Sequence, residues 1–231
     1  MKFSFVNPTQ IHFGQGQIAR IADAIPADRK VLLLYGGGSI KTNGVYEQVV
    51  SALAEHQWQE FAGVEPNPTV ETLDKAVAQV KDSGLDYILA VGGGSVIDGA
   101  KYVAAAALYD GEGWDILLGK HRVNQALPIG AVLTLPATGS ESNGGSVITK
   151  KATRDKLNFM SPAVQPGFAV LDPDVMKTLP ERQLANGLVD AWVHTCEQYL
   201  TLPTEAMVQE GYAEALLRTL KSLGERYAER D

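Results

Sequence analysis

The sequence lacks several features that define whole classes of protein. It has one cysteine, Cys196, among 231 residues, so no internal disulfide can form and a reducing compartment is favoured. Acidic residues outnumber basic ones by 27 to 20, so no basic patch for nucleic acid is expected. The longest apolar stretch, 102–108, is far shorter than the ~20 residues of a membrane span, and residues 1–5 carry no signal-peptide core. We therefore expect a cytoplasmic protein that binds neither nucleic acid nor membrane.

Short apolar runs alternate with helical periodicity over the first 180 residues. The run VLLLY at 31–35 and the run YILAV at 87–91 are apolar throughout, as expected for parallel strands buried on both faces. Strands that alternate with helices indicate βαβ units and an α/β fold with a mostly parallel sheet. The other predicted strands are 3–5, 11–13, 61–64, 129–133 and 168–171, and the predicted helices are 45–55, 70–81 and an Ala-rich helix that ends near Leu108.

The pattern changes to helix alone near residue 180. Residues 181–199 and 204–227 are predicted helices, with Thr204 as the N-cap of the second. Their large apolar side chains exceed what two helices can bury between themselves. Either they pack on the α/β part or they begin a helical domain, and the second interpretation is favoured. The predicted domains are 1–180, an α/β nucleotide-binding domain, and 181–231, the first helices of an all-helical domain.

The tetrapeptide GGGS occurs twice, each time between a buried strand and a helix, at 36–39 and at 92–95. Glycine lets backbone amides approach a phosphate, and the N-terminus of the following helix adds positive charge. The second copy, with Asp98 in its first turns, is the better phosphate site. Alternatively it is only a tight turn, with Ser95 as N-cap and Asp98 completing a capping box. Neither copy is the usual G-x-G-x-x-G fingerprint.

The first copy bears on the choice of cofactor. NAD is normally selected by a carboxylate that binds the ribose 2′-hydroxyl, and Gly36, Gly37, Gly38 and Ser39 include none. Backbone amides, the Ser39 hydroxyl and Lys41 could accept a 2′-phosphate, which favours NADP over NAD. Lys41 by itself fits a solvated lysine at the start of a helix better than a cofactor ligand.

Two further groups of polar residues are candidates for a site. The loop 134–143 is dense in small hydroxyl residues, which could line a phosphate or nicotinamide pocket or simply be solvated. Asp190 and His194 lie four residues apart, so they share one helix face at a spacing that suits two ligands of a divalent ion. A hydrogen-bonded or solvated pair would look the same. Of the other histidines, none is an evident third ligand.

Taken together, these stretches resemble the iron-containing (group III) alcohol dehydrogenase family, and most closely its NADPH-dependent aldehyde reductase and butanol dehydrogenase branch. The resemblance runs from about Ile11 to Leu202 and rests on GGGSVIDGAK at 92–101, TGSE at 138–141, EPNP at 65–68, LDP at 171–173 with TLP at 178–180, and Asn186-Gly187 with Asp190 and His194. It implies a nucleotide domain followed by a helical domain, with the active site between them.

The resemblance also implies roles for individual residues. Gly93, Gly94 and Ser95 would hold the pyrophosphate, and Gly37, Gly38 and Ser39 the adenosine ribose. Lys156 would lie near the nicotinamide ribose. The cofactor groove would be lined by Asn67, Thr134, Thr138, Ser140 and Leu179.

For catalysis, the resemblance implies an iron or zinc ion with Asp190 and His194 as its first two ligands. The ion would act on the carbonyl of a small aldehyde while the nicotinamide transfers hydride. The family's remaining ligands are histidines beyond residue 231, so we expect a fragment or truncated chain. A homodimer is expected, with residues 3–5 as an edge strand. Two alternatives stay open: a fold relative such as glycerol dehydrogenase or dehydroquinate synthase, and a nucleotide-binding module without turnover.

Overall fold

The computed structural model describes residues 2–201 and 205–229. The chain forms two compact units, one up to Lys177 and one from Thr178. In the first unit, a six-stranded sheet has the order β1-β8-β5-β4-β2-β3, and every neighbouring pair is parallel. The mostly parallel sheet predicted from the sequence is confirmed. Its strands are β1 (Gln10–Phe13), β2 (Lys30–Tyr35), β3 (Gln57–Phe61), β4 (Tyr87–Gly93), β5 (Ile129–Leu135) and β8 (Phe168–Leu171).

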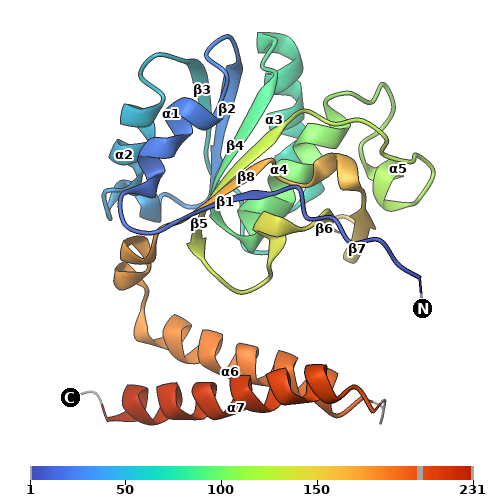
Figure 1. Cartoon of the computed structure of the whole chain (residues 1–231). Coiled ribbons are helices and arrows are strands. Elements are labelled where there is room, and N and C mark those ends of the chain that lie inside the picture. The colour runs from blue at the N-terminus through green and yellow to red at the C-terminus, as the bar shows by residue number, and fades with distance from the viewer. Residues whose placement is uncertain (1, 202–204, 230–231) are drawn as a thin grey trace. The chain divides into compact units, whose positions relative to one another are not determined.

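Helices cover both faces of this sheet. One face carries α1 (Ile21–Ala24) and α2 (Val45–Ala52), and the other carries α3 (Val70–Ser83) and α4 (Gly94–Ala106) (Figure 1). The side chains of β2 alternate between the two resulting cores: Val31 and Leu33 pack towards α2, while Leu32 and Leu34 pack towards α4. Because both faces are covered, β4 and the part of β2 from Val31 onward are apolar, as their sequences indicate.

The periodicity of the helices explains their position on the sheet. The buried residues of α3 are Val70, Leu73, Ala76 and Val80, a stripe of helical spacing that faces the core. The helix ends where Gly84 adopts a left-handed conformation with φ of 61°, in which its amide bonds to the carbonyl of Val80. A short α5 (Trp114–Leu117) follows α4 and buries Trp114.

An antiparallel hairpin lies outside the main sheet. It consists of β6 (Gly145–Lys150) and β7 (Asp155–Met160), and the sequence reasoning missed it. Both strands mix polar and apolar residues without a clean alternation, so the period-two signal is weak. One parallel bridge, between Thr149 and Thr69, joins β6 to the segment that precedes α3.

The structure corrects two predicted strands. Residues 3–5 have no regular secondary structure, and Phe3 and Phe5 are each 81% exposed, because no strand pairs with this segment in the described part of the chain. The strand predicted at 61–64 lies earlier, at β3. Gly63, with φ of 92°, breaks the extended backbone directly after Phe61.

The second unit is a pair of antiparallel helices, α6 (Glu181–Tyr199) and α7 (Met207–Ala228). The Tyr227 hydroxyl near the end of α7 donates to the carbonyl of Glu181 at the start of α6, at 2.9 Å. Neither helix has a buried residue, and Trp192, Val193 and Leu216 are among the exposed apolar side chains. Both helices were predicted. The predicted N-cap Thr204 lies outside the described residues.

Candidate functional site

The two glycine-rich turns follow adjacent strands of the sheet. The first, at 36–39, follows β2, and the second, at 92–95, spans the end of β4 and the start of α4. The helices that come next lie on opposite faces, α2 on one and α4 on the other (Figure 1). Adjacent parallel strands whose connections leave on opposite faces open a crevice at their carboxyl ends, and this is where open α/β sheets bind ligands. The two turns therefore lie side by side at the switch point of the sheet, where the connections of adjacent strands leave on opposite faces.

Close packing requires glycine in the second turn. A Cβ on Gly94 would lie 2.4 Å from Oγ1 of Thr138, and one on Gly92 would lie 2.5 Å from Cγ2 of Val96. A Cβ on Gly93 would lie 3.2 Å from Cβ of Leu135. The loop after β5 thus lies directly against the start of α4, and it brings Thr138 next to Gly94.

The N-terminus of α4 keeps its backbone amides available. Gly93 is the N-cap, and no side chain among the described residues caps the helix. The capping box considered for Ser95 and Asp98 is therefore not formed. The first amides of a helix have no intrahelical partner, and they attract an anion.

Asp98 instead anchors the loop that follows β5. Its Oδ1 accepts a hydrogen bond from the Ser140 hydroxyl at 2.6 Å, and its Oδ2 accepts one from the backbone amide of Val147 at 3.0 Å. Burial raises the pKa of Asp98, although both hydrogen bonds oppose the shift. Since both oxygens have partners inside the protein, Asp98 and Ser140 support the loop from within.

Lys101 completes this internal network, and the sequence reasoning assigned it no role. Its side chain is fully buried, and its ammonium donates to Ser140 Oγ at 2.8 Å, to Asn143 Oδ1 at 3.0 Å and to the carbonyl of Gly145 at 2.7 Å. Burial lowers the pKa of Lys101 to about 8, and the charge of Asp98 opposes that shift. A buried lysine is tolerated because each of its protons has an acceptor.

Asn67 and Lys156 lie beside the second turn. The backbone amide of Asn67 donates to Ser95 Oγ at 3.3 Å, and the Lys156 ammonium donates to Asn67 Oδ1 at 2.7 Å. Asn67 has φ of 58°, a left-handed conformation that asparagine tolerates better than most residues. These three predicted residues come from the loop before α3, from the start of α4 and from β7. The Lys156 ammonium is therefore an exposed cation close to the start of α4.

The space beside two glycines of the first turn, Gly37 and Gly38, is empty of protein atoms. A Cβ on Gly37 or Gly38 would meet nothing within 4 Å, although Gly38 has φ of 95° and so favours glycine. Gly36 is constrained by packing, because its Cβ would lie 3.2 Å from the carbonyl of Val64. Ser39 follows as the first residue of a short 3-10 helix, Ser39–Lys41.

A carboxylate that the sequence reasoning missed lies near the first turn. Glu60 on β3 pairs with the Lys41 ammonium at 3.4 Å and accepts hydrogen bonds from the hydroxyls of Tyr35 and Tyr46, both at 2.9 Å. The bond from Tyr35, and then that from Tyr46, lowers the pKa of Glu60. Lys41 also lies over the Tyr46 ring, 4.5 Å from its centroid. Lys41 is therefore partnered rather than simply solvated.

The proposed metal pair lies in the second unit. Asp190 Oδ1 and His194 Nε2 are 3.8 Å apart on α6, and each side chain is about half exposed. The pair shares a helix face, as its spacing indicates. Within residues 2–201 and 205–229, no group of three or more His, Cys, Asp or Glu side chains could hold a metal. A catalytic zinc normally has three protein ligands, so these residues do not complete a metal site. Leu179 also belongs to this unit.

The other histidines have structural contacts. His56 Nε2 lies 3.0 Å from the carbonyl of Ile25, and the His121 ring stacks on Tyr109 with centroids 4.0 Å apart. His12 lies on β1 and meets Phe168 edge to face.

Comparison with known proteins agrees with this geometry. A family model for iron-containing alcohol dehydrogenase matches residues 8–173. The Escherichia coli (strain K12) protein called NADPH-dependent aldehyde reductase YqhD is 53% identical over 221 residues, which are 94% of this chain and 57% of that protein. The probable NADH-dependent butanol dehydrogenase 1 of Bacillus subtilis (strain 168) is 48% identical over 221 residues, which are again 94% of this chain and 57% of that protein.

Solved structures show the same likeness. The crystal structure of NADH-dependent butanol dehydrogenase A from Thermotoga maritima matches with a TM-score of 0.91 and 45% identity, covering 99% of this chain and 58% of that one. The chain thus spans a little over half the length of these relatives. The matched part includes both glycine-rich turns, the loop 134–143 and the hairpin that carries Lys156. The chain belongs to the iron-containing alcohol dehydrogenase family.

Proposed function

We propose that this chain is the nucleotide-binding part of a metal-dependent alcohol dehydrogenase or aldehyde reductase, which transfers hydride between NADP(H) and a small aldehyde or alcohol. One observation carries the proposal: two glycine-rich turns follow the adjacent strands β2 and β4, whose helices leave on opposite faces of the sheet. The name of the E. coli relative, an NADPH-dependent aldehyde reductase, supports the choice of reaction.

The second turn binds the pyrophosphate in this proposal. Gly93 and Gly94 let the first amides of α4 approach it, and the Ser95 hydroxyl lies in the same turn. The Lys156 ammonium neutralises charge on the side towards the nicotinamide ribose, where Asn67 holds it. Lys is a compact cation whose three protons suit phosphate and ribose oxygens.

Thr134 and Thr138 line the cofactor groove beside this turn in this proposal. Thr134 is half-buried at the end of β5, and Thr138 is exposed where it meets Gly94. Asp98 and Ser140 act on the cofactor indirectly, because their polar atoms hold the loop 138–147 in place.

The first turn binds the adenosine ribose through Gly37, Gly38 and Ser39, with Gly36 closing the turn. NADP is favoured over NAD because the turn has no carboxylate of its own, and because Glu60 is engaged by Lys41 and two tyrosines. The relatives include both an NADPH-dependent and a probable NADH-dependent protein, so the preference requires measurement.

A bound nicotinamide supplies the hydride, while the protein orients it. Asp190 and His194 contribute two ligands to an iron or zinc ion. Because two donors do not complete a site, a second candidate function deserves a test: a nucleotide-binding module without turnover. The observation that favours it is the lack of a third donor within the described residues.

A homodimer in the cytoplasm is also proposed. β1 is an edge strand of the sheet, and Phe13 on it is 70% exposed. Phe3, Phe5 and Val6, just before β1, are also exposed. An open edge with apolar side chains beside it suits pairing with a second copy. Among the described residues, no helix is long and apolar enough to cross a membrane.

Titration calorimetry with NADPH and with NADH tests the nucleotide site. We expect both to bind and NADPH to bind more tightly. If neither nucleotide binds the folded chain, the proposal fails. Metal analysis, together with aldehyde-dependent oxidation of NADPH, then separates the two candidates: one divalent ion per chain with turnover supports the dehydrogenase, and binding without turnover supports the module.

A further inference from the structure

The β6–β7 hairpin is fastened to the loop 65–69. The backbone amide of Thr149 on β6 donates to the carbonyl of Pro68 at 2.9 Å. Thr149 is also the residue opposite Lys156 in the hairpin register. The strand position that carries Lys156 is therefore fixed to the same loop that carries Asn67.

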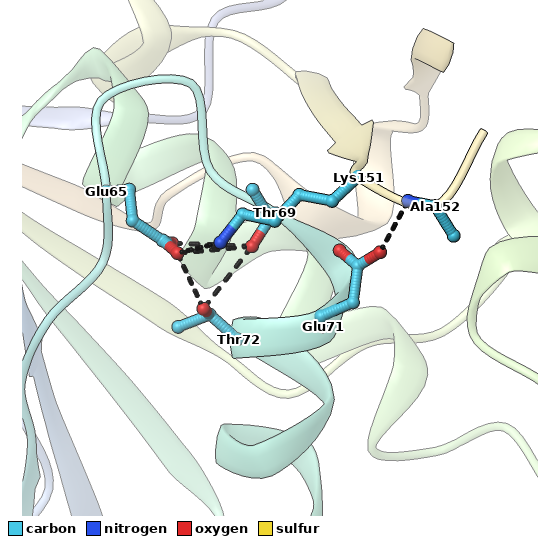
Figure 2. Close-up of polar contacts among 6 residues, drawn as sticks. All are labelled: Glu65, Thr69, Glu71, Thr72, Lys151 and Ala152. Carbon is cyan, nitrogen blue, oxygen red and sulfur yellow. Dashed lines mark hydrogen bonds and ion pairs between the residues drawn. The ribbon is translucent and has the colours of Figure 1, made fainter. Parts of the chain in front are cut away.

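A carboxylate strengthens this junction from the side of α3. Figure 2 shows Glu65 facing the side chains of Thr69, Thr72 and Lys151. Its Oε1 accepts hydrogen bonds from the Lys151 ammonium at 2.9 Å and from the Thr72 hydroxyl at 2.8 Å, and the Thr69 hydroxyl lies 3.3 Å away. Partial burial by itself would raise the pKa of Glu65, but the bonds from Lys151 and Thr72 outweigh it and lower the pKa to about 2. Glu65 is therefore an anion at neutral pH.

A second carboxylate holds the turn of the hairpin. Glu71 Oε1, in the first turn of α3, accepts a hydrogen bond from the backbone amide of Ala152 at 3.2 Å (Figure 2). Lys151 and Ala152 are the first residues after β6. The hairpin is thus tied to Glu65 of the loop by the Lys151 side chain and to Glu71 of α3 by the Ala152 amide, in addition to the bridge at Thr149.

The same loop also contacts the second glycine-rich turn. Asn67, two residues after Glu65, donates its amide to Ser95 and accepts from Lys156. Asn67 holds a left-handed φ of 58°, a conformation that its contacts with Ser95 and Lys156 help to stabilise. The contacts of Glu65 hold the loop 65–69 and the hairpin together, so they affect the positions of Asn67 and Lys156.

We propose that Glu65 is a positioning residue for nucleotide binding: through Lys151 and Thr72 it fixes the hairpin against the loop 65–69, so that Lys156 is held beside Ser95. The proposal rests on the function proposed above, since it concerns the nucleotide bound at that turn. A lysine that is already in place loses less side-chain freedom on binding, so the ligand binds more tightly.

Removing a surface ion pair that has no positioning role would leave NADPH binding unchanged. The Lys151 side chain is 60% exposed, and exposed pairs contribute little to stability. Glu65→Gln should therefore lower the unfolding midpoint only slightly at neutral pH, and its effect on NADPH binding should depend on Lys156. The same hairpin offers a matched control, because Lys150 pairs with Glu112 at 3.4 Å without touching the loop 65–69.

The experiment is a double-mutant cycle on the full chain, with NADPH binding measured by calorimetry. Glu65→Gln should weaken binding by about three- to ten-fold, the effect of leaving one long side chain to be ordered by the ligand. Lys156→Met should weaken it further. In the Lys156→Met background, Glu65→Gln should have no additional effect. Glu112→Gln should bind like the wild type.

The outcomes separate the hypotheses. If the wild type binds NADPH and Glu65→Gln binds it equally well, the positioning role is wrong. If the losses from Glu65→Gln and Lys156→Met simply add, Glu65 acts through general stability and the inference is again wrong. If the wild type itself does not bind NADPH, the proposed function fails first, and the inference fails with it.

Discussion

An alanine at position 94 should damage the fold and the nucleotide site together. Its Cβ would lie 2.4 Å from Oγ1 and 2.9 Å from Cγ2 of Thr138, whereas carbon contacts are normally about 3.5–4.0 Å. Either the loop or the start of α4 must move by about 1 Å, and such overpacking lowers the free energy of unfolding by about 1–3 kcal/mol. If the shift removes one amide-to-phosphate hydrogen bond, worth about 1.5–3 kcal/mol, NADPH binding weakens at least about ten-fold.

Urea denaturation and calorimetry with NADPH measure the two effects separately. Thr138→Ala in the same chain removes both close atoms and leaves one contact at 3.2 Å, so the double variant should recover part of the stability. Gly37→Ala is the control: its Cβ meets nothing within 4 Å, so stability should be unchanged while nucleotide approach at the first turn is obstructed. A Gly94→Ala chain as stable and as tightly binding as the wild type would refute the reasoning. So would a Thr138→Ala partner that restores nothing.

Three further predictions concern charged groups. Lys101→Met removes three hydrogen bonds at a fully buried position, although Asn143 Oδ1 keeps the bond from the Gly145 amide, so urea denaturation should show a loss of more than about 2 kcal/mol. The pKa of Glu65 is lowered from 4.5 to about 2, so its contribution to stability is present above pH 4.5 and is lost as the pH falls towards 2. Glu65→Gln should flatten this part of the acid-denaturation profile, and an unchanged profile would contradict the assignment. His194→Ala should weaken Zn²⁺ binding and leave NADPH binding unchanged, both by calorimetry; loss of NADPH binding would contradict separate roles.

Much of the sheet could be predicted because its strands are simple in composition. β4 and the part of β2 from Val31 onward are apolar, since helices cover both of their faces, and a GGGS turn lies at the carboxyl end of each strand. The helix α3 could be predicted from its apolar stripe. Residues 3–5 could not, because an apolar alternation does not reveal whether a neighbouring strand is available to pair with it.

The network around the second turn was largely hidden from the sequence. In the sequence Lys101 is only the last residue of the motif at 92–101. In the structure it is fully buried and donates hydrogen bonds to three oxygens of residues 140–145. Glu60 lies on a strand with few apolar residues, and nothing in its sequence context links it to Lys41. The β6–β7 hairpin, which carries Lys156, mixes polar and apolar residues, so it was not predicted.

The sequence by itself determined the chemistry that the chain can offer: bare amides after two apolar strands, a hydroxyl-rich loop, and a carboxylate and an imidazole four residues apart on one helix. Local patterns suffice for this because strand burial, helix periodicity and glycine turns depend on neighbouring residues. Only the tertiary structure decided that β2 and β4 are adjacent with their helices on opposite faces, and that Asp98, Lys101 and Glu65 support the site from behind. Those relations join residues that are far apart in the chain, and they depend on how strands are ordered in the sheet, which no short segment of sequence encodes.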